Sequence, residues 1–501
     1  MTKPSIGEKN RSRLLEDLSR FAFGAAAESR VNASDKELFY EHLPIAEHRR
    51  VLDDETLLVL GGRGAGKSQL FNVLRRLTDP TSLLTHDKKG EGTTALYRTG
   101  YAQSDTQFPS ADVFQQINNT LEVTQLRHLW LGLLCGVLLK EEKTQDVISA
   151  NLDSSTSELL KTKLAMPSRW LPVVEAKLES ISSALDRADE HLRELDQSIV
   201  ITYDDLDVLA AKIVDIYPLV GALLAFWLRS SRRWRRLRCK IFLRTDIFES
   251  DALNFSDSSK LKPMSITLSW SEQNLYRLVL KRLVNGKQGT NWLEFLESSV
   301  PASNLKPSQQ WGLIPTTTET HHRAFMENLI GRWMGTDKRK GDTYRWFLNH
   351  LQDSLGDIAP RSFLQIFEFS AQGQLQVGLP SGKHLLIPEQ INGALGEVSK
   401  GRIAELQEEF TWIRTLEKNL VGMTVPIERN KLKTEIMSAS DWKAFPKHLA
   451  EQQKRGDYLI DYLVSLGILR VTADNRIHVP DIYLFGFGMK RKGGIRRPRI
   501  T

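Results

Sequence analysis

The residue types best suited to chemistry lie together between Gly61 and Ser68, where the sequence reads GGRGAGKS. This spacing fits G-x-x-x-x-G-K-[ST], a loop that binds phosphate groups. Its glycines let backbone N–H groups turn inward without a clash from Cβ. Lys67 is expected to reach the β- and γ-phosphates of a nucleotide, and Ser68 to bind Mg²⁺. The predicted nucleotide-binding residues are Gly61, Gly62, Arg63, Gly64, Ala65, Gly66, Lys67, Ser68 and Gln69.

The segments on either side of this loop have the patterns that such a site needs. Residues 56–60 form an apolar, strand-like run, and residues 69–77 carry leucines at helical spacing. A strand, a glycine loop and a helix in that order bring the positive end of the helix dipole to the phosphates. A glycine-rich turn that fits the spacing by chance is the alternative, and these flanks disfavour it.

Two acidic residues follow a second apolar run, residues 198–203. After a phosphate-binding loop, Asp204 is expected to hold the Mg²⁺ opposite Ser68, and Asp205 to orient or deprotonate the attacking water. Many hydrolysing ATPases have glutamate at the second position, so Asp205 is a shorter base. Asp207 could support this group of residues or cap the next helix. The alternative is that Asp204 and Asp205 only cap a helix after the strand.

Polar residues also end a third strand-like run, residues 240–246. There Thr245 could sense the γ-phosphate or the lytic water, and Arg244 could stabilise charge on the transferring phosphoryl group. The alternative for Arg244 is an ordinary salt bridge with Asp246. Arg361, which follows a proline at the start of a helix, could reach the nucleotide from another domain, or it could be a surface arginine.

Strand-like and helical segments alternate through this part of the chain. Such alternation predicts a parallel sheet covered by helices on both faces. Ligands of such sheets bind at the carboxyl ends of the strands. The loop, the two aspartates and the Arg244-Thr245-Asp246 cluster all fall at those ends, so they are expected to meet at one edge.

Residues 111–195 have long helical patterns and form a predicted insertion in this core. Leu171, Leu178, Leu185 and Leu192 recur every seven residues, and a second apolar series, Val174, Ile181, Ala188 and Leu195, follows three residues later. The pattern favours either one arm of an antiparallel helix pair or an ordinary amphipathic helix packed on the core.

The C-terminal part predicts a winged-helix-like domain. A helix ended by Gly467 is followed by two short strands, residues 470–472 and 476–479, that flank a turn. No acidic residue follows Asp481. Two basic clusters could contact phosphate of a nucleic acid or of a neighbouring subunit's nucleotide, or could be solvated surfaces. They comprise Arg229, Arg232, Arg233, Arg235, Arg236, Arg238 and Lys240 in one case, and Lys490, Arg491, Lys492, Arg496, Arg497 and Arg499 in the other.

Composition is that of an ordinary soluble protein with several domains. The chain has 501 residues, 26% of them charged, and a net charge of +7. Its two cysteines suggest neither a disulfide scaffold nor a zinc site, and no apolar run is long enough to span a bilayer. A cytoplasmic protein without a membrane role is expected. The predicted domains are a helical lead-in over 1–50, a P-loop core over 51–275 with the insertion at about 111–195, a helical lid region over 276–425, and the winged-helix-like domain with its basic tail over 426–501.

These motifs together resemble the P-loop ATPases of the AAA+, STAND and KAP type. The matching pieces are GGRGAGKS, IVITYDDLD, IFLRTDIF, the lid helix LYRLVLKRL and Pro360-Arg361. The segment from IFLRTDIF to LYRLVLKRL and the ending DNRIHVPDIYLFGFGMKRKGG resemble uncharacterised bacterial ATPases often linked to anti-phage defence loci. The chain lacks the membrane helices of KAP relatives and the repeat array of many STAND proteins. The resemblance implies ATP and Mg²⁺ as cofactors and Arg361 as a second sensor.

Three functions follow as hypotheses. The first is an ATP-hydrolysing molecular switch or oligomeric scaffold that serves bacterial anti-phage defence with an effector protein partner, since no nuclease, deaminase or protease constellation is visible in the chain. The alternative is a DNA-binding AAA+ loader or initiator that uses the winged-helix-like domain and basic tail. A small-molecule kinase shares the P-loop, but the tandem Asp204-Asp205 and the large lid argue against it.

Overall fold

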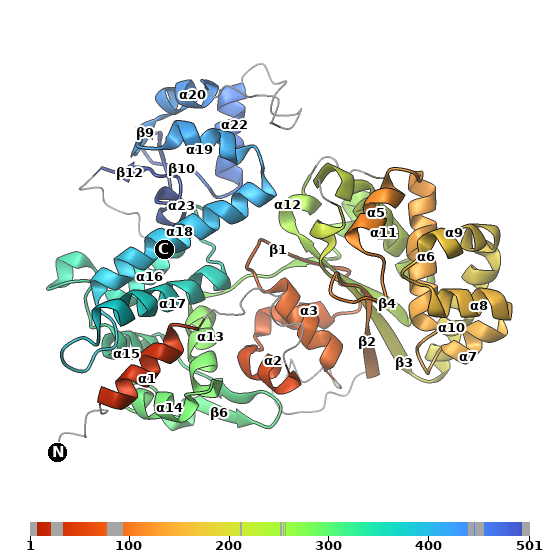
Figure 1. The fold of residues 1–501 in the computed structure, drawn as a ribbon, viewed down its shortest axis with the longest axis horizontal. Helices are drawn as coiled ribbons and strands as arrows, with labels where there is room; N and C mark the ends of the chain where they lie inside the picture. Colours follow the sequence, from red (N-terminus) through yellow and green to blue (C-terminus); the bar gives the residue numbers. More distant parts are fainter. Residues whose placement is uncertain are drawn as a thin grey trace. The chain divides into compact units, whose positions relative to one another are not determined.

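The computed structural model describes residues 8–21, 34–77, 94–210, 213–250, 253, 255, 257–438, 445 and 455–492. The chain divides into two compact units, which are treated separately (Figure 1). The sheet unit contains Ala26–Ser269 and Ser308–Gly312, and the helical unit contains the rest of the chain. The expected lead-in over residues 1–50 is not one element, because α1 (Glu8–Leu18) belongs to the helical unit and α2 (Asp35–Glu41) to the sheet unit.

The sheet unit is built on five parallel strands, as the alternating pattern predicted. They are β1 (Leu58–Gly61), β2 (Thr94–Tyr101), β3 (Gln197–Tyr203), β4 (Leu237–Arg244) and β5 (Ser265–Thr267). Their order in the sheet is β2-β3-β4-β1-β5, and every neighbouring pair is parallel. All four residues of β1 are buried. Strands buried on both faces read as continuous apolar runs, which is why the sequence showed them.

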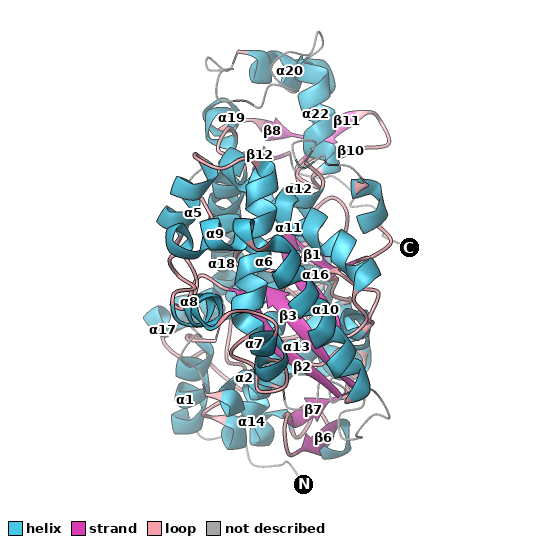
Figure 2. Cartoon of the chain, turned by 90° about the vertical axis from the view of Figure 1, so that its right-hand side faces the viewer, coloured by secondary structure: helices cyan, strands magenta, loops and turns pink. Residues whose placement is uncertain are grey.

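Helices cover both faces of this sheet. Figure 1 shows α2 and α3 on one face and α5, α6 and α11 on the other, and Figure 2 shows the strands as a layer behind α6 and α10. The helices of the sheet unit after α2 are α3 (Lys67–Arg76), α5 (Ala111–Asn118), α6 (Val123–Leu138), α7 (Gln145–Ala150), α8 (Ser154–Thr162), α9 (Pro167–Ala176), α10 (Leu178–Glu194), α11 (Ile213–Arg233) and α12 (Thr245–Phe248).

The heptad pattern of residues 171–195 belongs to helices packed on the core, not to a projecting arm. The series is interrupted at Lys177, where α9 ends and α10 begins. Leu185 and Leu192 are fully buried in the same apolar cluster as Trp130 and Trp170, whereas Leu195, the last member of the seam, is exposed. The sevenfold spacing therefore reflects two amphipathic helices that face one core.

The helical unit contains the remaining helices and several short strands. Its helices after α1 are α13 (Glu272–Asn285), α14 (Gly289–Leu296), α15 (Glu319–Leu329), α16 (Thr343–Leu351), α17 (Pro360–Val377), α18 (Pro388–Glu409), α19 (Ile413–Leu420), α20 (Arg429–Met437), α22 (Arg455–Ser465) and α23 (Asp481–Leu484). Strands β6 (Leu305–Ser308) and β7 (Gly312–Pro315) pair with each other, and the C-terminal strands are β8 (Thr424–Val425), β9 (Ile427–Glu428), β10 (Arg470–Val471), β11 (Arg476–His478) and β12 (Lys490–Arg491).

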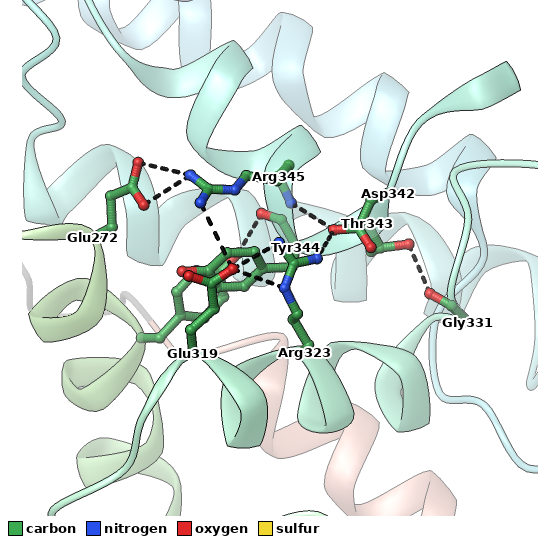
Figure 3. A network of polar contacts seen from close by, with 9 residues as sticks. Glu272, Glu319, Arg323, Gly331, Asp342, Thr343, Tyr344 and Arg345 are labelled. Atoms are coloured by element: carbon green, nitrogen blue, oxygen red, sulfur yellow. Dashed lines mark hydrogen bonds and ion pairs between the residues drawn. The ribbon is translucent and has the colours of Figure 1, made fainter. Parts of the chain in front are cut away.

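A polar network joins α13, α15 and α16 (Figure 3). Arg323 donates to Glu319 and Asp342, with N–O distances of 2.8 and 2.6 Å, and its guanidinium lies 4.6 Å from the ring centroid of Tyr344. Arg345 pairs with Glu272 at the start of α13. Both arginines are matched by carboxylates, so this network holds the three helices in register.

The C-terminal region has the winged-helix arrangement that the sequence predicted. Strands β10, β11 and β9 form an antiparallel sheet beside α20 and α22. Gly467, with φ of 76°, follows α22, and Asn475, with φ of 61°, forms the turn between β10 and β11. Left-handed backbone favours glycine and asparagine at such places. Of the predicted basic tail, Lys490 to Lys492 are described, and Arg496, Arg497 and Arg499 lie outside the described residues.

Hydropathy was also checked against the helices. Within the described part of the chain, no helix combines the length and the apolar character needed to cross a bilayer.

Candidate nucleotide-binding site

The predicted phosphate-binding loop connects the end of β1 to the start of α3. Gly64 and Gly66 have φ of 75° and 98°, a left-handed backbone that side chains rarely tolerate. The N–H of Ala65 donates to the carbonyl of Gly62 at 3.3 Å, which closes the turn. The sequence thus places glycine where the loop reverses direction, and α3 begins directly at Lys67.

Lys67 turns back over its own loop. Its Nζ donates to the carbonyl oxygens of Gly61 at 2.8 Å and Gly62 at 3.0 Å. The ammonium is therefore held among the loop carbonyls at the N-terminal end of α3. From there, a negatively charged phosphate at the helix N-terminus could take over its hydrogen bonds.

Asp204 lies directly after β3 and is 4% exposed. Its carboxylate is hydrogen-bonded to the hydroxyl of Ser68, and its backbone N–H donates to the carbonyl of Tyr101 at 3.1 Å. Burial, and then the neighbouring charge of Asp205, raise the pKa of Asp204, while Ser68 and Lys67 act in the opposite direction. Two crowded carboxylates beside a hydroxyl make a place that favours a cation.

The donor set fits Mg²⁺. A serine hydroxyl and a carboxylate are hard oxygen ligands, and Mg²⁺ is usually held by one or two such groups together with substrate phosphates and water. Ser68 and Asp204 would hold the ion. Among the described residues, no group of three or more His, Cys, Asp or Glu side chains could bind a metal by itself, so the phosphates would have to complete the coordination.

Asp205 has an unusual backbone. Its φ is 57°, in the left-handed region, and it precedes the short 3-10 helix Leu206–Val208 without a side-chain capping bond to it. Its Oδ2 instead accepts a hydrogen bond from the N–H of Gln103 at 3.2 Å. Strained backbone at a charged residue is typical of functional sites. The simple helix-capping alternative for Asp205 has no hydrogen bond to support it.

Arg244 is held by two carboxylates next to the loop. The parallel register places Arg244 of β4 opposite Gly61 of β1. Its guanidinium donates to Asp246 at 2.6 and 3.0 Å and to Asp207 at 3.3 Å, and it is almost fully buried. The expected salt bridge with Asp246 therefore exists. Asp207 extends it, since its Oδ2 also lies 3.9 Å from Nη2 of Arg63 in the loop.

The remaining predicted residues are placed in different surroundings. Thr245, half-buried, opens α12 directly after Arg244 and so stays at the same edge of the sheet. Gln69 on α3 donates to the carbonyl of Leu38 at 3.4 Å. Arg361 lies in the helical unit, as the second residue of α17, where it donates to Glu405 at 2.8 Å. Its role toward a nucleotide stays a prediction.

The arginine cluster at the end of α11 is paired within its own unit. Arg233 binds Asp186 through two nitrogens, and Arg236 lies 2.8 Å from Asp196. The carboxylate of Asp189 accepts the backbone N–H groups of residues 235–237. These contacts anchor the α11–β4 connection to α10, which accounts for much of the cluster's charge.

Sequence reasoning missed Gln103 and the link between Arg63 and Asp207. Gln103 and Asp205 are 102 positions apart in the chain, and nothing in the local pattern connects them. The Arg63–Asp207 contact had a weak signal only, an arginine inside the glycine loop.

Comparison with known proteins gives a limited result. No protein-family model and no curated protein matches the chain. Three solved structures are similar over most of their length. They are Cdc6p from Pyrobaculum aerophilum (14% identity, TM-score 0.27, 85% of this chain and 83% of that one), ORC2 from Aeropyrum pernix in ADPNP–ADP complexes (11%, 0.36, 91% and 93%), and Aeropyrum pernix ORC1 in complex with DNA (13%, 0.30, 95% and 90%). At these TM-scores the similarity transfers no function to this chain.

Proposed function

We propose that this protein binds ATP with Mg²⁺, hydrolyses it, and uses the cycle as a molecular switch. The observation that carries the proposal is the hydrogen bond between Asp204 and Ser68, at a sheet edge where Lys67 lies within a glycine loop. The motif predicted each residue separately from spacing. Their meeting through strands that are distant in sequence supports one common site.

Each side chain has a distinct task in this mechanism. Lys67 would leave the loop carbonyls for the β- and γ-phosphates, and the backbone N–H groups of the loop would bind the phosphates. Ser68 and Asp204 would hold Mg²⁺, which when bound neutralises charge on the phosphate oxygens. Asp205 would orient the attacking water and accept its proton, with Gln103 holding the carboxylate in place. Thr245 would contact the same water, and Arg244 would stabilise the phosphoryl group.

Two substitutions test this assignment. Lys67→Ala should abolish hydrolysis by weakening nucleotide binding, whereas Asp205→Asn should keep nucleotide binding and lower turnover by a factor of about 10² to 10⁴, the usual contribution of a general base. Binding of a fluorescent ATP analogue and release of phosphate are measured separately. Turnover that survives Lys67→Ala would contradict the site, and loss of binding in Asp205→Asn would contradict the role of Asp205 as base.

For the switch itself, we propose a homo-oligomer that acts with an effector protein, in bacterial anti-phage defence as the sequence resemblance implies. Nucleotide binding at the sheet edge would change the protein's surface, and the toxic chemistry would lie in the partner. Light scattering with ADP and with a non-hydrolysable ATP analogue tests this. A nucleotide-dependent change in assembly size is expected, and identical sizes in both states would argue against it.

A DNA-handling loader or initiator is the second candidate, and the winged-helix arrangement of β9, β10, β11, α20 and α22 favours it. Charges on α22 are less favourable, because Asp457 and Asp461 face Arg429, and Asp457 also binds Lys433. Truncation after Lys492 removes three arginines and leaves the buried residues of this region intact. Weaker binding to duplex DNA would favour the loader, and unchanged binding would remove the tail from it.

A further inference from the structure

A cationic groove lies along the free edge of the parallel sheet, away from the phosphate-binding loop. It is a cavity of about 360 Å³ beside β2, between the end of α3 and the end of α6. Four of its lining side chains are cations and one is an acid. They are Arg75, Arg76, Arg98, Lys140 and Glu141.

The acids near the groove do not balance these cations. Glu141 is bound to Arg98, and Arg76 lies 3.5 Å from Asp35, whose side chain is 67% exposed. Lys140 donates to the amide oxygen of Gln107 at 3.1 Å. Asp105, whose charge acts on both Arg75 and Lys140, is itself hydrogen-bonded by Gln107. Excess positive charge is thus left facing the cavity.

Burial makes this positive charge costly. Burial, and then the neighbouring Arg76, lower the pKa of Arg75, and burial lowers the pKa of Lys140. Partly desolvated cations that repel each other would be stabilised by a bound anion. A bound anion at Arg75 would also be felt at the nucleotide site, because the charge of Asp205 acts on Arg75.

Size and lining select the kind of anion. The volume lies at the low end of small-molecule pockets and exceeds what a single phosphate fills. Tyr97 and Val137 are the large nonpolar side chains of the lining, and both are almost fully buried. Such a lining offers charge to phosphates and little apolar surface to a base or ring.

We infer that this groove binds consecutive phosphate groups of a second ligand, distinct from the nucleotide at the loop. Two sources share that chemistry, the backbone of a nucleic acid and a free polyphosphate. Recognition would rest on Arg76 and Lys140, the cations not matched by a buried acid, with Arg75 between the groove and the ATP site.

The test uses the full-length protein with Lys67→Ala, so that phosphate binding at the loop does not interfere. In that background Arg76→Gln with Lys140→Gln removes two groove cations, and neither change strands a buried acid. Lys161→Gln with Lys163→Gln removes two exposed cations on the helical insertion and is the matched control. The probes are a labelled single-stranded oligonucleotide, followed by anisotropy over a range of salt, and inorganic tripolyphosphate, followed by calorimetry.

If the groove binds a nucleic-acid backbone, the groove variant loses about tenfold or more in oligonucleotide affinity, and its salt slope falls by about 0.7 for each lost phosphate contact. If the ligand is a free polyphosphate, only tripolyphosphate binding is lost. Equal affinities in the groove and control variants for both probes, or no binding of either probe before the groove is changed, would overturn the inference. ATP binding by the protein with Lys67 intact reports on the proposed function separately.

Discussion

The carboxylate of Asp207 lies 3.3 Å from Nη1 of Arg244, and the same oxygen lies 3.9 Å from Nη2 of Arg63. One acid thus connects the phosphate-binding loop to the end of the neighbouring strand. Because Arg244 is buried and bound to two carboxylates, its position depends on Asp207 and Asp246 together. The connection suggests that loop geometry and the strand end respond to each other.

Replacing Asp207 should therefore impair the ATP site without unfolding the sheet unit. We expect Asp207→Asn to lower kcat/KM for ATP by about tenfold, equivalent to about 1.4 kcal/mol, because Arg63 and Arg244 lose their shared partner. Steady-state phosphate release measures it. Asp196→Asn, which removes an exposed partner of Arg236 far from the loop in sequence, is the control and should match the unmodified protein. Equal kinetics in both variants would exclude this coupling.

Loop glycines offer a second test. Gly66→Ala should weaken ATP binding by about tenfold or more, since a left-handed backbone costs an ordinary residue roughly 1–2 kcal/mol. Gly62→Ala is the matched control, because an added Cβ there meets no atom within 4 Å and its φ is not positive. Titration with a fluorescent ATP analogue compares the two. An equal loss in both variants would mean that backbone strain is not the cause.

The Ser68–Asp204 pair predicts a specific dependence on Mg²⁺. Ser68→Ala and Asp204→Asn should each raise the Mg²⁺ concentration needed for half-maximal hydrolysis, because each removes one oxygen ligand. Ser68→Thr keeps the hydroxyl and should behave like the unmodified protein. Activity is measured while Mg²⁺ is titrated at constant ATP. Unchanged midpoints in the first two variants would argue that these oxygens do not bind the ion.

A buried lysine gives a prediction about stability and pH. Lys281 on α13 is fully buried, and burial lowers its pKa from 10.5 to about 7. Between these values the unfolded chain binds a proton that the folded chain does not, so stability falls as pH decreases from about 10.5 to 7 and the full cost is present below 7. Lys281→Met should remove this cost.

The expected gain at neutral pH is on the order of a few kcal/mol, at about 1.4 kcal/mol for each tenfold change in the protonation equilibrium. Thermal melts between pH 6 and pH 10 would show the gain shrinking as pH rises, conditions that span the two pKa values. Lys383→Met, at an exposed position of the same unit, should leave the melting temperature unchanged. A gain that is constant with pH would indicate better packing in place of relieved charge burial.

Local sequence was sufficient for the parts of this protein that depend on neighbouring residues. The glycine loop, the buried strand before it, the strand that ends at Asp204 and the turn at Asn475 were all predicted, because backbone preference and apolar periodicity reside in contiguous residues. The heptad pattern was ambiguous for the same reason. A seven-residue spacing fits a coiled coil or a helix on a core equally well, and only the packing of Leu185 against that core distinguished them.

The nucleotide-binding loop, the parallel-sheet class and the winged-helix pattern were thus determined by the sequence alone, since each rests on local conformation. The tertiary structure alone decided that β4 lies between β1 and β3, which places Arg244 beside Gly61. It also decided that Gln103 holds Asp205 and that Asp207 joins two arginines. These contacts join residues far apart in the chain, and their partners are chosen by the path of the backbone through the sheet, which no local pattern encodes.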